Sequence, residues 1–146
     1  MTTNQTTSTL DHLDVVAQEL TTTPWLIACL CAAWCDTCQS YRQQFNELRQ
    51  NHRDKIFAWI DIEDHSELID DLDIENFPTI LIEYDSKVLF LGTMLPDASL
   101  VHKLILNYQS IIQEKSVAAI TASIQDNNGE LDHDWSLSSQ IQKKYS

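Results

Sequence analysis

The stretch WLIACLCAAWCDTC, residues 25–38, decides the fold of this chain. Its first part, Trp25 to Ala33, is apolar throughout, which predicts a central strand buried under helices on both faces. From Cys35 to about Arg49 the apolar residues recur with a helical period. They are Cys38, Tyr41, Phe45 and Leu48. A buried strand therefore ends, and an amphipathic helix begins, at the Cys-Asp-Thr-Cys segment.

Further helices and strands are predicted on both sides of this stretch. The helices are expected at residues 10–20, 35–49 and 66–72 and, after a cap at Asp97 or Ser99, up to Ile112. The strands are expected at 25–33, 55–62, 79–84 and 88–91, with a hairpin turn at Asp85-Ser86. This order predicts an α/β fold with a central mixed sheet of four to five strands flanked by helices.

The length of 146 residues favours a single domain with a core of its own. We place this domain at residues 10–116. Residues 1–9 are rich in Thr and Asn and are expected to be disordered. Residues 117–146 form a C-terminal extension that is predicted to be helical or partly disordered, with Trp135 as its one large anchor.

The charge balance is strongly acidic, with 22 Asp and Glu against 9 Lys and Arg and a net charge of −13. Nucleic-acid binding needs clustered basic residues, and anionic membranes attract basic surfaces, so the sequence argues against both partners. Such a charge is typical of a protein that stays soluble and monomeric, although a basic partner surface would also be attracted to it. The acidic run within residues 61–75 is interpreted as a solvated face, with an ion site as the alternative.

The beginning of the chain has no pattern of a secretory leader. Residues 1–20 contain no Lys or Arg and no apolar core. The longest apolar run, residues 24–35, is too short to cross a bilayer. We therefore expect a cytoplasmic protein whose thiols are kept reduced.

The pair Cys35 and Cys38 has the position that thiol chemistry requires. Backbone N–H groups at a helix start are unpaired and the helix dipole is positive there, so a thiolate on Cys35 is stabilised. Two intervening residues bring the sulfur of Cys38 within bonding reach. We predict that Cys35 is the nucleophile that attacks a substrate disulfide and that Cys38 resolves the mixed disulfide. Trp34 is expected to shield the exposed sulfur of Cys35. The alternative to a reactive dithiol is that Cys35 and Cys38 are two inert, buried cysteines.

A zinc site is the rival interpretation of the four cysteines Cys29, Cys31, Cys35 and Cys38. Zinc requires ligands that converge on one point. Cys29 and Cys31 lie within the predicted strand and are expected to point away from the helix start, and no histidine is near them in sequence. We therefore expect no metal. His65 and His102 are expected at the surface, without partners.

Two motifs resemble those of the thioredoxin family. The segment AAWCDTC, residues 32–38, is similar to the family's active-site segment, whose usual form is Trp-Cys-Gly-Pro-Cys. Phe77-Pro78-Thr79 resembles the family's cis-proline loop, which packs against the dithiol and pairs its backbone with the substrate peptide. Residues 58–62 resemble the strand before that loop, and Gly92 falls where the family has a glycine near the substrate groove. The resemblance covers roughly residues 10–112.

This resemblance implies a thioredoxin fold and a thiol-disulfide oxidoreductase that reduces disulfides in protein substrates. It implies a substrate surface made by Trp34, Phe77, Pro78 and Gly92. No bound cofactor is expected, because a separate reductase would supply the electrons. Two other functions stay open: a thioredoxin-fold binding or chaperone-like module, and a redox sensor in which the Cys35–Cys38 bond gates partner binding.

Three departures from the family pattern are expected to tune the site. Asp36-Thr37 replaces Gly-Pro, and a carboxylate beside the thiol disfavours the thiolate. Cys29 and Trp59 stand where thioredoxin has a buried Asp and its lysine, which removes a general base for the resolving step. Cys29 is then a substitute redox group or, more simply, a small core residue. Phe77 is bulky for the position before the proline, where it either narrows the groove or packs in the core.

Overall fold

The described chain alternates helices and strands. The computed structural model describes residues 12–72, 74, 76–114 and 135–145. In chain order the elements are α2 (Leu13–Glu19), β1 (Trp25–Cys31), α3 (Asp36–Asn51), β2 (Ile56–Asp61), the 3-10 helix η1 (Ser66–Leu68), β3 (Thr79–Tyr84), β4 (Lys87–Thr93), α4 (Ala98–Glu114) and α6 (Leu137–Tyr145). The predicted disorder of residues 1–9 falls outside the described residues.

The strands of the described residues form one mixed sheet in the order β2-β1-β3-β4. β1 runs parallel to β2 and antiparallel to β3. β3 and β4 form an antiparallel hairpin whose turn residues, Asp85 and Ser86, both have positive φ angles, as a tight hairpin turn requires. The predicted α/β fold, with a central mixed sheet flanked by helices, is confirmed.

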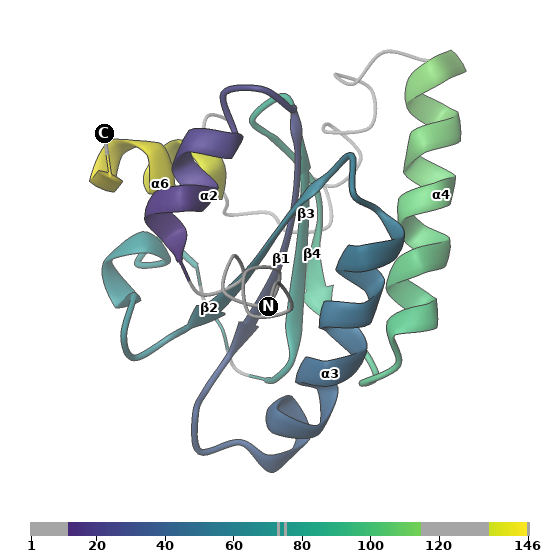
Figure 1. Cartoon of the computed structure of the whole chain (residues 1–146). Coiled ribbons are helices and arrows are strands. Elements are labelled where there is room, and N and C mark those ends of the chain that lie inside the picture. Colours follow the sequence, from purple (N-terminus) through teal and green to yellow (C-terminus); the bar gives the residue numbers. More distant parts are fainter. Residues whose placement is uncertain (1–11, 73, 75, 115–134, 146) are drawn as a thin grey trace, which may run out of the picture.

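Helices cover both faces of this sheet (Figure 1). α3 and α4 lie against one face, and α2 and α6 lie together against the other. All seven residues of β1 are buried, because the strand has a neighbour on each side and helices on both faces. The end of β1 and the start of α3 therefore lie at one edge of a fully packed core.

An aromatic cluster fixes α3 against β2. Phe45 is fully buried, and the centroid of its ring lies 5.4 Å from that of Phe57 and 5.8 Å from that of Trp59. Tyr41, one turn earlier in α3, lies 6.0 Å from Phe45. Because α3 begins at the Cys-Asp-Thr-Cys segment, these contacts determine where the start of the helix sits relative to the sheet.

A buried carboxylate joins α6 to the sheet. Glu83 of β3 is fully buried and accepts hydrogen bonds from the backbone N–H groups of Leu137 and Ser138, at the start of α6. A carboxylate at a helix N-terminus satisfies donors that the helix itself leaves unpaired. Burial raises the pKa of Glu83 to about 7, and the hydrogen bonds from Ser138 and Leu137 only partly oppose this rise.

The Glu83 carboxyl is expected to make the folded state less stable as the pH rises. Since its pKa is about 7 in the folded chain and 4.5 as a reference, the folded state holds the proton more tightly. The resulting stabilisation is complete below pH 4.5 and is lost as the pH rises through 7. Its size is on the order of 3 kcal/mol. Glu83→Gln should remove this part of the pH dependence in urea unfolding; parallel stability curves for the two proteins would contradict the prediction.

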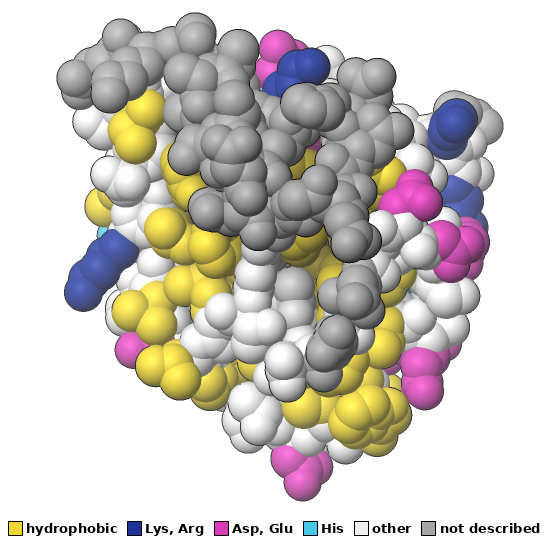
Figure 2. Space-filling model, turned by 180° about the vertical axis from the view of Figure 1, so that it is seen from behind, with side chains coloured by type: hydrophobic (Ala, Val, Ile, Leu, Met, Phe, Trp, Pro, Cys, Tyr) yellow, Lys and Arg dark blue, Asp and Glu magenta, His cyan; other side chains and the backbone are white. Residues whose placement is uncertain are grey.

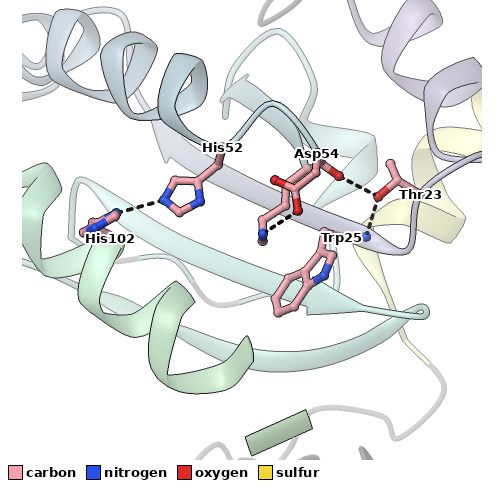
Figure 3. A network of polar contacts seen from close by, with 6 residues as sticks. Thr23, Trp25, His52, Asp54 and His102 are labelled. Carbon is pink, nitrogen blue, oxygen red and sulfur yellow. Dashed lines mark hydrogen bonds and ion pairs between the residues drawn. The ribbon is translucent and has the colours of Figure 1, made fainter. Parts of the chain in front are cut away.

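Polar contacts at the end of α3 join it to neighbouring segments (Figure 3). Nε2 of His52, the residue after α3, lies 2.8 Å from Nδ1 of His102 on α4. The N–H of Lys55 donates to the carbonyl of His52, and the Nζ of Lys55 pairs with the Asp54 carboxylate at 2.9 Å. The expectation that His102 has no partner is therefore wrong, because the packing of α4 beside α3 brings the two rings together. His65, which is expected at the surface, is half-buried.

Acid is expected to weaken the folded state through His52. Burial lowers the pKa of His52, and the charges of Lys55 and His102 lower it further, against the opposing charge of Asp54. Below pH 6.5 the unfolded chain then binds a proton that folded His52 resists, so the stability from this group is lost as the pH falls. Between neutral pH and mild acid, the melting temperature of His52→Gln should therefore fall by less than that of the wild type. Equal losses in thermal unfolding would contradict this.

Candidate functional site

Cys35 occupies the N-cap position of α3. Its backbone is extended, with φ −89° and ψ 114°, and its side chain makes no capping hydrogen bond. The thiol is half-buried and free, and the next two residues, Asp36 and Thr37, are exposed. Cys38 is the third residue of the helix and is buried. N-cap and third-residue side chains lie on the same side of the first turn, so the two cysteines share one helix start.

An aromatic pair borders Cys35. Trp34 is 64% exposed, and its ring meets Phe77 edge-on, with 5.6 Å between the centroids. Phe77 is half-buried: it packs against the core and also contacts Trp34. The Phe77-Pro78 peptide bond is cis, and the carbonyl of Pro78 accepts a hydrogen bond from the N–H of Met94 at 3.4 Å.

Gly92 lies on β4 beside the strand that follows Pro78. It pairs with Ile80, next to the Thr79–Thr93 pair. A Cβ atom at Gly92 would come within 3.3 Å of the Phe90 ring, which is tighter than an ordinary contact. The absence of a side chain therefore lets the Phe90 ring lie over the backbone at this point.

Apolar surface surrounds the start of α3. Figure 2 shows apolar side chains at the lower end of the molecule, the end at which α3 begins in Figure 1. The most exposed large apolar residues of the described chain include Trp34 and Leu95, at 64% and 73%. An exposed tryptophan beside a half-exposed thiol can bind an apolar segment of another chain.

The structure pairs Cys38 with Cys31, not with Cys35. A disulfide joins Cys31, the last residue of β1, to Cys38, with 5.9 Å between the Cα atoms. The Sγ of Cys29 lies 3.4 Å from the Sγ of Cys31. The expectation that Cys29 and Cys31 point away from the helix start is therefore wrong.

The two-residue period of a strand explains this correction. Residues two apart on a strand point to the same face, so Cys29 and Cys31 must point the same way. The resemblance puts Cys29 at the position of the acid that serves the resolving thiol, Cys38. Cys31 lies on the same strand face, two residues nearer to the start of α3. Sequence reasoning missed Cys31 as a site residue, although the spacing of the two cysteines carried the signal.

Cys29 and Trp59 stand at the two positions where the resemblance implies a buried Asp and its lysine. Cys29 is fully buried and pairs in register with Trp59 of β2. The Arg42 guanidinium of α3 lies 5.0 Å from the centroid of the Trp59 ring, where a cation interacts favourably with the aromatic face. Burial raises the pKa of the Cys29 thiol, and the charge of Arg42 opposes that rise only in part. Cys29 is therefore a protonated, neutral thiol rather than a ready base.

Metal sites and membrane spans are two further features on which the described residues bear. In the described ranges, no group of three or more His, Cys, Asp and Glu residues is arranged to hold a metal ion. None of the helices in the part of the chain that the structure describes has the length and apolar character needed to span a bilayer.

Comparison with known proteins gives one consistent result. A family model described as Thioredoxin matches residues 5–104. Among curated proteins, Thioredoxin domain-containing protein 2 of Mus musculus is 40% identical over 48 residues, which are 33% of this chain and 9% of that protein. The chain thus spans less than a tenth of that relative's length.

Solved structures show the same fold. Oxidised mitochondrial thioredoxin 3 of Saccharomyces cerevisiae superposes with a TM-score of 0.58 at 15% identity, over 70% of this chain and 98% of that one. The long form of spinach chloroplast thioredoxin f gives 0.58 at 16% identity, over 73% and 94%. A poplar thioredoxin h gives 0.57 at 22% identity, over 66% and 86%.

Proposed function

Because this chain belongs to the thioredoxin family, we propose that it is a thiol-disulfide oxidoreductase that reduces disulfides in protein substrates through Cys35 and Cys38. The observation that carries the proposal is the placement of Cys35. It is a free, half-exposed thiol at the N-cap of a 16-residue helix, with Cys38 one turn further on. A redox role in general follows from the family, and the reductase activity is the specific step that we add.

The chemistry begins with Cys35. From the N-cap of α3, its sulfur attacks one sulfur of a substrate disulfide as a thiolate. The other substrate sulfur leaves as a thiol, and a mixed disulfide is formed on Cys35. Cys38 then attacks the Cys35 sulfur and releases the second substrate thiol. Two electrons pass to the substrate, and a Cys35–Cys38 disulfide is left on the protein.

We propose that the substrate chain lies across Trp34, Phe77, Pro78 and Gly92. The exposed face of Trp34 supplies apolar contact area at a low cost in side-chain entropy. The Phe77 ring meets Trp34 edge-on, so the two rings restrict which side chains fit beside the reacting disulfide. Leu95, another exposed apolar side chain of the described residues, follows Met94, whose N–H donates to the Pro78 carbonyl.

We propose that four residues tune the rate of this reaction. The Asp36 carboxylate follows Cys35 directly and places a negative charge beside the attacking sulfur, and Thr37 leaves the first turn less rigid than a proline would. Cys29 and Trp59 replace the family's acid and lysine and supply no general base for Cys38. Turnover is therefore expected to be slower than in relatives that keep the acid.

The partners follow from the same proposal. The substrates are proteins with accessible disulfides, and a separate reductase returns two electrons to the dithiol, so no bound cofactor is needed. The net charge of −13 argues against nucleic acid and anionic membrane as partners and favours a monomer. We propose that the protein acts in the cytoplasm, where reduced thiols persist.

Insulin reduction by dithiothreitol tests this function. We expect the wild type to accelerate the precipitation of insulin chains and Cys35→Ser to reduce the rate to that of dithiothreitol alone. Cys29→Ala is the matched control: it removes a buried cysteine of the same cluster and, like Cys29 itself, supplies no general base, so the activity should be kept. If the wild type is no faster than Cys35→Ser, the protein is better described as a thioredoxin-fold binding module.

A further inference from the structure

Cys38 lies within reach of two other cysteines. It shares the first turn of α3 with Cys35, and it is bonded to Cys31 at the end of β1. We propose that Cys31 is a third redox-active cysteine, which takes Cys38 away from Cys35 by internal thiol-disulfide exchange. This inference rests on the proposed function, because that reaction forms the Cys35–Cys38 disulfide from which the exchange starts.

The geometry favours the transfer of the disulfide toward the core. The Cα atoms of Cys31 and Cys38 are 5.9 Å apart, within the range that a disulfide spans without moving the backbone. Both residues are only 1% exposed, whereas Cys35 is half-exposed. Cys31 lies on a central strand, and Cys38 lies on a helix that the Phe45 cluster (Phe45 with Tyr41, Phe57 and Trp59) fixes against the sheet. The packing of β1 against α3 therefore holds the two sulfurs together.

The exchange is balanced without an added oxidant or reductant. The Cys31 sulfur, as a thiolate, attacks the Cys38 sulfur of the Cys35–Cys38 disulfide. The Cys31–Cys38 bond forms while the Cys35–Cys38 bond breaks, and Cys35 leaves as a thiolate. The proton that Cys31 loses is taken up by Cys35, so the protein as a whole is neither oxidised nor reduced.

The exchange ends at Cys31. The Cys29 sulfur is 3.4 Å from that of Cys31, close enough to continue the chain of exchanges. However, the structure leaves Cys29 as a free thiol and bonds Cys31 to Cys38, so the disulfide rests between β1 and α3.

The consequence is an oxidised form with a free surface thiol. Cys35 remains able to form a mixed disulfide with a substrate or a small thiol, but Cys38 is no longer available to resolve it. The oxidised protein should therefore hold its partner covalently until the buried disulfide is reduced. Substrate release then depends on the reductant that reaches Cys31 and Cys38.

Alkylation of the oxidised protein tests the inference. The wild type is oxidised with diamide to one disulfide, treated with iodoacetamide while folded, and mapped by peptide mass spectrometry. We expect Cys35 to be alkylated and Cys31 to be linked to Cys38. Oxidised Cys31→Ala should retain the Cys35–Cys38 bond and show about tenfold less alkylation at Cys35. Cys29→Ala should behave like the wild type.

The wild-type map decides the outcome even if a variant does not fold. A Cys35 that is blocked by Cys38 in the oxidised wild type would overturn the inference. Insulin reduction by the fully reduced wild type reports on the proposed function separately. An active reduced protein whose oxidised form has a blocked Cys35 overturns the exchange alone, whereas an inactive reduced protein whose oxidised form carries the Cys31–Cys38 bond overturns the reductase alone.

Discussion

Cys38→Ala is expected to lose insulin turnover by about 100-fold or more while it accumulates a covalent complex on Cys35. The second thiol acts within the same helical turn, at an effective concentration far above that of any free thiol. Without it, the mixed disulfide must wait for dithiothreitol from solution. Mass spectrometry under non-reducing conditions should find the substrate chain attached to Cys35.

A matched substitution separates this effect from general damage to the cysteine cluster. Cys29→Ala removes a sulfur that lies on the same strand face as Cys31 and should turn over insulin without accumulating a complex. Cys35→Ser should neither turn over nor form the complex. A Cys38→Ala protein that keeps wild-type turnover would show that Cys38 is not the resolving thiol.

Phe45→Ala is expected to destabilise the fold by about 3–5 kcal/mol, since it deletes a fully buried ring and leaves a cavity. The ring contacts Phe57 and Trp59 on β2 and so links the helix that bears the dithiol to the sheet. Urea unfolding followed by circular dichroism measures the change.

Phe45→Leu is the companion variant, because it keeps most of the apolar volume and should cost clearly less than alanine. Gln43→Ala, at an exposed position of the same helix, should leave the free energy of unfolding within about 0.5 kcal/mol of wild type. If Phe45→Ala were as mild as Gln43→Ala, the aromatic cluster would not be what holds α3 in place.

Hydrophobic periodicity predicted the elements around the site well. The continuous apolar run from Trp25 matches β1, and the change to a helical period matches α3. The hairpin at Asp85-Ser86 lies where turn residues separate two apolar runs. The expected helix at residues 66–72 is only a short 3-10 helix at 66–68, since acidic residues offer it few apolar positions to bury.

Contacts between distant segments could not be predicted in the same way. The bond between the backbone of α6 and Glu83 joins residues more than 50 positions apart, and the sequence gives no sign that this carboxylate is buried. The His52–His102 contact depends on how α4 packs beside α3. Residues 117–134, within the predicted extension, lie outside the described residues, whereas residues 137–145 form the helix α6.

The Cys31–Cys38 bond is neither an element predicted by periodicity nor a contact between distant segments. Its two residues are only seven positions apart, and the strand period alone predicts that the side chains of Cys31 and Cys29 lie on the same face of β1. The sequence does not show that the start of α3 lies over this face of β1. The side-chain packing of the Phe45 cluster determines this position, and such packing depends on the whole core.

The most direct measurement is a single turnover of the reduced wild type with an equal amount of a short peptide disulfide. Samples are quenched with acid at successive times and analysed by mass spectrometry. We predict that a peptide adduct on Cys35 appears first and then decays to a protein that has lost two hydrogens, with both peptide thiols released. An unchanged peptide disulfide, or a first adduct on any other cysteine, would contradict the assignment of Cys35 as the nucleophile.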